Sequence, residues 1–183
     1  MLTKDMLKNQ VEDFLRGKGD FVQIDYLNRY LKLMPSIEMR KFAYIKLSEI
    51  YEKRKMFTEA ARAYRNASMN CTIFREKVNC LIEEAKRYIK ATEFIESDKA
   101  VKIALSEATF EQKKQIAEDI KAFYRKVAEE FEKEMKRNQA SKIYEKMLKM
   151  NFSEEEKQKI KLKLKELYEK LGKIKEIRFL EGI

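Results

Sequence analysis

The sequence predicts an all-helical protein, and its composition is the first reason. Four glycines and one proline in 183 residues are too few for an architecture rich in β-turns. Lys, Glu, Leu, Ala and Met are abundant, and all of them favour helices. With 44% apolar and 39% charged residues, the chain can bury a core beneath an ionised surface, which is typical of one folded unit.

Apolar residues recur with the helical period in a series of short segments, which is the second reason. Gly17 and Gly19 separate the first two segments, and Pro35 ends the second. No break between segments is long enough for an interdomain linker. We expect helices at 4–16, 20–33, 37–54, 58–69, 74–94, 98–108, 110–136, 138–150, 154–171 and 174–180.

Four Ser and Thr residues lie where these helices should begin. Ser36 and Ser97 are predicted N-caps, because a hydroxyl oxygen there can accept a hydrogen bond from the first helical turn. The other two have the spacing of a capping box, Thr109 with Gln112 and Ser153 with Glu156.

The chain also matches itself when it is shifted by 80 residues. The segment 43–70, AYIKLSEIYEKRKMFTEAARAYRNASMN, lies over 123–150, FYRKVAEEFEKEMKRNQASKIYEKMLKM, without a gap. The matches fall on positions that should pack one helix against its neighbour. They are Tyr44 with Tyr124, Leu47 with Val127, Ser48 with Ala128, Tyr51 with Phe131, Ala60 with Ala140, and Tyr64 with Tyr144.

This order of aromatic, large apolar and small residues resembles the tetratricopeptide repeat, a helix-turn-helix unit of 34 residues. The small residues Ser48 and Ala60 should let the paired helix axes approach, while the rings of Tyr44, Tyr51 and Tyr64 fill the spaces between repeats. Ala67 follows at the next small position. The glycine usual in the first helix of this repeat is missing from the units that begin near Lys41 and Lys121.

The resemblance implies a right-handed α-solenoid of about four stacked antiparallel helix pairs, closed by a C-terminal capping pair, in one domain over 1–183. The third unit keeps Leu81, Ala85 and Tyr88, then Leu105 and Ala108, and on this alignment needs about four extra residues between its halves. A plain helical bundle stays open as an alternative. The units are expected at 4–37, 41–74, 78–112 and 121–152, with capping helices at 154–181.

The resemblance further implies a non-catalytic scaffold that binds an extended peptide or helix of a partner protein on a concave face lined by the first helices. Because that face is predominantly basic, a partner segment with carboxylates around an apolar residue would suit it. The expected partner-binding residues are Lys8, Arg16, Ile45, Lys46, Glu49, Lys53, Ile82, Lys86, Lys90, Arg125, Glu129 and Lys133. A clamp for a C-terminal carboxylate is disfavoured, since Glu12 stands where such clamps use asparagine, four residues after Lys8.

RNA or another nucleic acid is the alternative partner. Segment 157–175 carries eight lysines, and Lys157, Lys161 and Lys165 recur every fourth residue, so they could follow phosphates. The same segment also carries an apolar stripe typical of a packed helix, whose opposite face is commonly lysine-rich, and it lacks aromatic residues interleaved with arginine for base stacking.

Catalysis, cofactors and metals have no visible support in the sequence. The chain has no histidine, no Gly-rich phosphate loop and no activated nucleophile, so we expect no enzyme activity and no cofactor. Cys71 and Cys80 lie nine residues apart and form no zinc motif, which predicts two reduced structural thiols and no metal.

The N-terminal segment is charged throughout and has no apolar leader, and no run of eighteen apolar residues occurs. We therefore expect a cytoplasmic protein without a membrane partner, and exposed apolar ends would support self-association. The abundance of Lys and Glu also resembles thermophilic composition.

Overall fold

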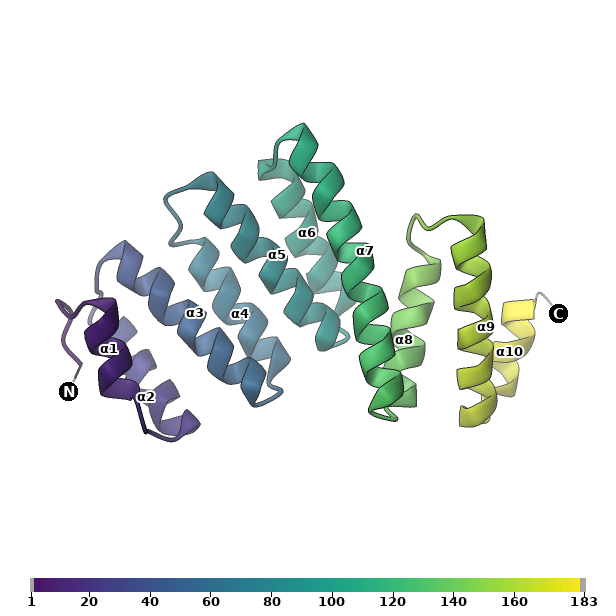
Figure 1. Cartoon of the computed structure of the whole chain (residues 1–183), viewed down its shortest axis with the longest axis horizontal. Coiled ribbons are helices and arrows are strands. Elements are labelled where there is room, and N and C mark those ends of the chain that lie inside the picture. Colours follow the sequence, from purple (N-terminus) through teal and green to yellow (C-terminus); the bar gives the residue numbers. More distant parts are fainter. Residues whose placement is uncertain (1, 182–183) are drawn as a thin grey trace. The chain divides into compact units, whose positions relative to one another are not determined.

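The computed structural model describes residues 2–181, which form ten α-helices and contain no strand (Figure 1). The prediction of an all-helical protein is confirmed. The helices are α1 Lys8–Leu15, α2 Asp20–Lys32, α3 Ile37–Lys53, α4 Phe57–Ser68, α5 Phe74–Lys90, α6 Phe94–Glu107, α7 Phe110–Lys133, α8 Arg137–Leu148, α9 Glu154–Leu171 and α10 Ile174–Glu181.

The chain divides into two compact units, unit 1 over residues 1–113 and unit 2 over residues 114–183. In unit 1, helices that follow one another in the chain pack together from α2 to α6. In unit 2, α9 packs against α8 on one side and α10 on the other. The helices therefore pack in adjacent pairs within each unit.

Three of the four predicted N-caps are confirmed. The Ser36 hydroxyl accepts a hydrogen bond from the Met39 amide at 3.3 Å. Reciprocal bonds join the two members of each capping box, Thr109 with Gln112 and Ser153 with Glu156. Each of these bonds satisfies an amide that the helix itself leaves unpaired.

Ser97 is not a cap, and the prediction for it was wrong. Helix α6 begins earlier, at Phe94, so Ser97 lies in its first turn and is only 1% exposed. Helix α1 also begins later than expected, at Lys8.

Three helical hairpins, α3–α4, α5–α6 and α7–α8, share one type of turn. In each, the second residue after the first helix has a φ near +60°, and the next amide donates to a carbonyl five residues earlier. This pair of features defines the Schellman motif. The positive φ values belong to Lys55 (59°), Thr92 (59°) and Met135 (58°), and the bonds are Met56 N to Tyr51 O (2.9 Å), Glu93 N to Tyr88 O (2.9 Å) and Lys136 N to Phe131 O (2.8 Å).

The shared turn aligns α5–α6 with the other two hairpins without an insertion. Ser97 takes the position of Ala60 and Ala140, so the expected four extra residues and the assignment of Leu105 and Ala108 were wrong. The extra length lies in α7, which has 24 residues whereas α3 and α5 have 17 each. Seven residues are about two helical turns.

Small side chains at the equivalent positions are buried, as predicted for Ala60 and Ala140. Ala60 and Ala140 are fully buried, and Ser97 nearly so. The Ser48 hydroxyl is also buried and donates to the Ala60 carbonyl at 2.9 Å, which links α3 directly to α4. Because a larger side chain at position 60 would meet α3, these residues fix how closely the paired helices pack.

Candidate functional site

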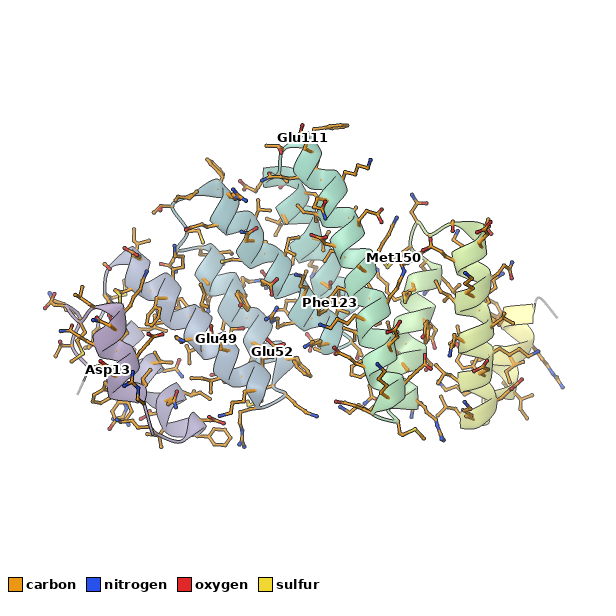
Figure 2. All side chains as sticks on the ribbon, viewed as in Figure 1. Asp13, Glu49, Glu52, Glu111, Phe123 and Met150 are labelled. Atoms are coloured by element: carbon orange, nitrogen blue, oxygen red, sulfur yellow. The ribbon has the colours of Figure 1, made fainter. Side chains whose placement is uncertain are left out.

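Ion pairs connect alternate helices of unit 1. Glu12 on α1 pairs with Lys46 on α3 at 3.0 Å, and Glu52 on α3 pairs with Arg87 and Lys90 on α5 at 2.7 and 2.9 Å. Figure 2 shows Glu49 and Glu52 together on α3. Further pairs join Lys8 to Glu38 and Lys41 to Glu76, both at 2.7 Å. We call this set of residues on α1, α3 and α5 the charged face.

The charged face includes several of the predicted partner-binding residues, and their charges are already matched. Lys46 bonds both Glu12 and Glu49; although burial opposes it, these bonds raise the pKa of Lys46. Burial likewise opposes the shift at Glu52, where Lys90 and Arg87 lower the carboxyl pKa. A carboxylate arriving from a partner would therefore compete with the chain's own carboxylates.

The remaining predicted residues of unit 1 are paired with other carboxylates or are covered, and Glu83, the partner of Lys86, also bonds Arg87 of the charged face. Arg16 pairs with Asp13 at 2.7 Å, Lys53 with Asp20 at 2.8 Å, and Lys86 with Glu83 at 2.7 Å. Ile45 is half-buried, and Ile82 is only 8% exposed, so it offers little surface to a partner. The expected apolar contact on this face is therefore small.

Three predicted residues, Arg125, Glu129 and Lys133, belong to α7 within unit 2. Arg125 pairs with Glu156 at the start of α9, and its guanidinium lies 4.9 Å from the centre of the Phe152 ring. Glu129 and Lys133 are exposed.

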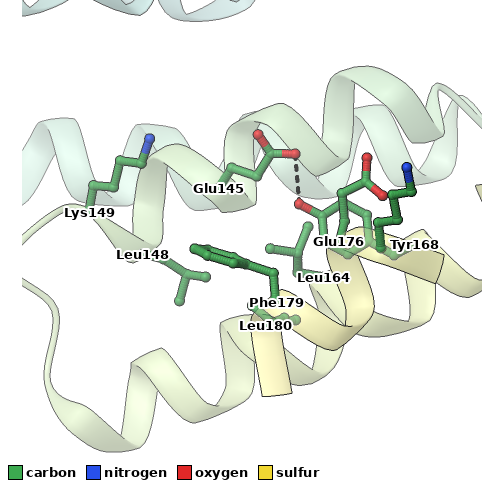
Figure 3. Close-up of a pocket in the computed structure, with 9 residues that line it drawn as sticks. Glu145, Leu148, Lys149, Leu164, Tyr168, Glu176, Phe179 and Leu180 are labelled. Carbon is green, nitrogen blue, oxygen red and sulfur yellow. Dashed lines mark hydrogen bonds between the residues drawn. The ribbon is translucent and has the colours of Figure 1, made fainter. Parts of the chain in front are cut away.

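An apolar pocket of about 600 Å³ opens between α8, α9 and α10 of unit 2 (Figure 3). Leu164 and Tyr168 form its buried part, whereas Phe179 is 88% exposed. We call this site the C-terminal pocket. It is lined by Glu145, Leu148, Lys149, Leu164, Tyr168, Lys175, Glu176, Phe179 and Leu180.

Hydrogen bonding fixes one wall of the C-terminal pocket. The Tyr168 hydroxyl donates to Glu145 at 2.9 Å, the bond drawn in Figure 3. Burial and this carboxylate together raise the pKa of Tyr168 above its usual range, so the phenol stays protonated and keeps the bond. The wall therefore joins α8 to α9.

A tight turn places α10 beside the pocket. Gly172 ends α9 with a φ of +69°, and the Lys173 amide donates to the Tyr168 carbonyl at 2.9 Å, so the chain turns back at once into α10. Helix α10 has eight residues whereas α9 has 18. Helix α10 packs against α9, and side chains of α8, α9 and α10 together line the pocket.

Sequence reasoning missed the C-terminal pocket. The available signal was the number of large apolar residues in α10, which include Ile174, Ile177 and Phe179. Phe179 and Ile174 are exposed, which is more apolar surface than a helix that only closes a stack needs.

The lysines of α9 form a second exposed surface of unit 2. Lys157 pairs with Glu154 at 3.2 Å and Lys163 with Glu132 at 3.5 Å, while Lys159, Lys161 and Lys170 are exposed. The apolar stripe predicted for this helix is confirmed, since Ile160, Leu164, Leu167 and Tyr168 are buried.

Comparisons with known proteins add no identification: no family model, no curated protein and no solved structure matches this chain. Within the described residues, no three His, Cys, Asp or Glu side chains gather as metal ligands would. None of the helices over 2–181 has the length and apolar character needed to cross a membrane.

Proposed function

We propose that the chain is a non-catalytic scaffold of tetratricopeptide-like helix pairs that binds a segment of a partner protein in the C-terminal pocket. The repeated Schellman turns support the repeat character, as do the ion pairs between alternate helices. Glu12 and Lys46 are 34 residues apart, and Glu52 and Arg87 are 35 apart, close to the 34-residue period of this repeat.

The observation that carries the proposal is the apolar lining of the C-terminal pocket. Leu148, Leu164 and Leu180 surround a volume that fits one or two large apolar side chains, and Phe179 can close over them. Burying such a side chain contributes about 1.5 to 3 kcal/mol. An amphipathic helix presents apolar side chains at this spacing, which makes it the occupant that we propose.

The charges at the rim indicate which amphipathic helix fits. Lys149 and Lys175 line the pocket, and both are exposed. Of the two carboxylates in the lining, Glu145 is engaged by Tyr168 and Glu176 is exposed, so two lysines face one exposed carboxylate at the rim. A partner helix with carboxylates beside its apolar residues would thus be favoured, in line with the chain's net charge of +10.

The charged face is a poorer site for such a partner. A carboxylate that binds Lys46 or Lys90 must displace Glu12 or Glu52, and exchanging one surface ion pair for another gains little, because each contributes about 0 to 1 kcal/mol. The apolar pocket has no such competitor, so it can supply net affinity.

Two labelled peptides of matched length test the proposal by fluorescence anisotropy with the full chain. Both carry leucines at helical spacing, one with glutamates and the other with lysines between them. We expect the glutamate peptide to bind, and Phe179→Ala to weaken binding by about tenfold. The matched control is Phe110→Ala, since Phe110 is 89% exposed in unit 1 and lies outside the pocket.

A charge-reversed pair separates the rim from general electrostatics. Lys175→Glu should weaken the glutamate peptide and strengthen the lysine peptide, whereas Lys142→Glu, on an exposed site of α8 outside the pocket, should change neither by more than about twofold. Equal binding of both peptides, or an unchanged affinity for Phe179→Ala, would contradict the proposed site.

Nucleic acid is the second candidate, and exposed lysines on α9 favour it. Lys159, Lys161 and Lys170 could contact phosphates. Binding of random single-stranded RNA across a salt series tests this function. RNA would be favoured over the protein partner if the wild-type affinity falls steeply as salt increases and if Lys159→Glu and Lys161→Glu abolish the binding.

A further inference from the structure

The two cysteines of the chain lie in contact where α4 meets α5. Their sulfur atoms are 3.7 Å apart, with Cys71 in the turn and Cys80 two helical turns into α5. Cys71 is half-buried and Cys80 is buried. A disulfide holds the two sulfurs about 2 Å from each other, so the side chains must rotate to bring them from contact to bonding distance.

We propose that Cys71 and Cys80 are a reversible disulfide site, oxidised by exchange with a small-molecule disulfide such as oxidised glutathione. The Cys71 thiolate attacks one glutathione sulfur, which forms a mixed disulfide and releases the first glutathione thiolate. The Cys80 thiolate then attacks the Cys71 sulfur and releases the second glutathione. Overall the protein loses two protons and two electrons, and both electrons end on the two glutathione thiols.

Exposure sets the order of these steps. Cys71 is the more accessible sulfur; burial raises its pKa, but the hydrogen bond with Cys80 and the charge of Lys41 work against that rise. Burial raises the pKa of Cys80 to about 12, so this thiol reacts poorly with a reagent in solvent. Held against Cys71, it is nonetheless placed to resolve the mixed disulfide.

The Cys71–Cys80 disulfide would restrict the turn between α4 and α5, which carries exposed apolar residues. Met69, Ile73 and Phe74 lie at this turn and are all exposed. A disulfide between positions 71 and 80 closes a short ring that contains the turn and the start of α5. Because such a ring restricts the unfolded chain, oxidation should stabilise the protein and fix this apolar surface.

Incubation of the full chain with excess oxidised glutathione tests the site. After quenching in acid, we expect intact mass spectrometry to show the loss of two hydrogens with no glutathione attached, and thiol titration in denaturant to fall from two thiols to none. Dithiothreitol should restore both thiols. The oxidised protein should melt at a higher temperature than the reduced protein.

Two variants assign the roles. Cys80→Ser should stop at one attached glutathione, because the resolving thiol is missing, and Cys71→Ser should react at least about tenfold more slowly than Cys80→Ser. A wild-type protein that retains a glutathione adduct would overturn the proposal. A disulfide-linked dimer would also overturn it. So would a wild-type protein that still has two free thiols after the incubation time in which the Cys80→Ser variant has reacted.

Discussion

The hairpins α3–α4 and α5–α6 of unit 1 have the same backbone turn but different interiors. At the equivalent position of the first helix, α3 has Leu47, which is 3% exposed, and α5 has Glu84, which is 1% exposed. Ala60 of α4 is likewise replaced by Ser97 in α6. The turn and the small residue therefore specify the hairpin, while one interior position accepts either an apolar side chain or a charge.

The charge is tolerated because a neighbouring helix supplies its partner. Arg65 of α4 donates from Nε to Glu84 Oε1 at 2.8 Å and also pairs with Glu96 at 3.4 Å. Glu84 Oε2 and the Ser97 hydroxyl are buried without a hydrogen-bond partner. Burial raises the pKa of Glu84 even though Arg65 opposes the shift. A buried ion pair of this kind adds little net stability but is costly to break.

Arg65→Met should have the largest effect, a loss of about 3 kcal/mol in the free energy of unfolding near neutral pH, because Glu84 is left charged and unpaired. The loss should shrink toward about pH 5, where the lone carboxyl can take a proton. Urea denaturation at both pH values measures it. An equal loss at both would show that Glu84 is not the cause.

Replacing the small residue of a hairpin by leucine should have the second-largest effect. Ala60→Leu and Ala140→Leu should each lower the free energy of unfolding by about 1 to 3 kcal/mol, because the added atoms have no space between the paired helices. Ala122→Leu, on an exposed site of α7, is the control and should change stability by less than about 0.5 kcal/mol. Unchanged melting of the first two variants would refute the assigned packing.

Glu84→Leu makes the interior of α5–α6 resemble that of α3–α4, and it removes a buried carboxylate while Arg65, which is 37% exposed, keeps its pair with Glu96. This variant should therefore raise the free energy of unfolding by about 1 kcal/mol at about pH 8. The folded-state pKa of Glu84 is raised, so its stabilising contribution is present at low pH and is lost as the pH rises through that pKa. The gain should therefore be smaller at about pH 4. If the stability gain of Glu84→Leu were larger at low pH than at high pH, the pKa of Glu84 would not be raised as described, and the account would be contradicted.

Thr92→Gly should have the smallest effect, a gain of about 0.5 kcal/mol, because a β-branched residue is strained at a φ of 59° and glycine is not. Thr72→Gly is the control, since Thr72 is exposed and outside the positive-φ positions, and should be neutral or destabilising. Thermal melting compares the two variants. A lower melting temperature for Thr92→Gly would mean that the Thr92 side chain stabilises the fold by more than the strained turn destabilises it.

The sequence predicted the helices well because apolar period, caps and Pro35 are local signals. The sequence-based prediction placed the start of α6 too late, because a serine before an apolar run is typical of an N-cap. Ser97 is instead buried, and its burial depends on tertiary packing that the local sequence does not show. Glu84 likewise reads as a surface residue until Arg65 is seen beside it. The single-domain solenoid over 1–183 and the concave site stay predictions.

The large apolar residues of α10 were the sequence signal for the C-terminal pocket, but residue types do not show which side chains gather around it. Leu148, Leu164 and Phe179 are ordinary core residues in sequence, and only the packing of α8, α9 and α10 shows that they line one pocket. The cations of the charged face raised the opposite difficulty. Lys46 and Lys90 look like free ligands in the sequence, although carboxylates 34 and 38 residues earlier in the chain already pair with them.

Hydrogen–deuterium exchange of the full chain, with and without the glutamate peptide, tests the proposed function most directly. The account predicts slower exchange at 145–149, 164–168 and 175–180, and unchanged exchange over 41–53 on the charged face. Protection over 41–53 with none around the pocket would contradict it, and would place the partner on α3.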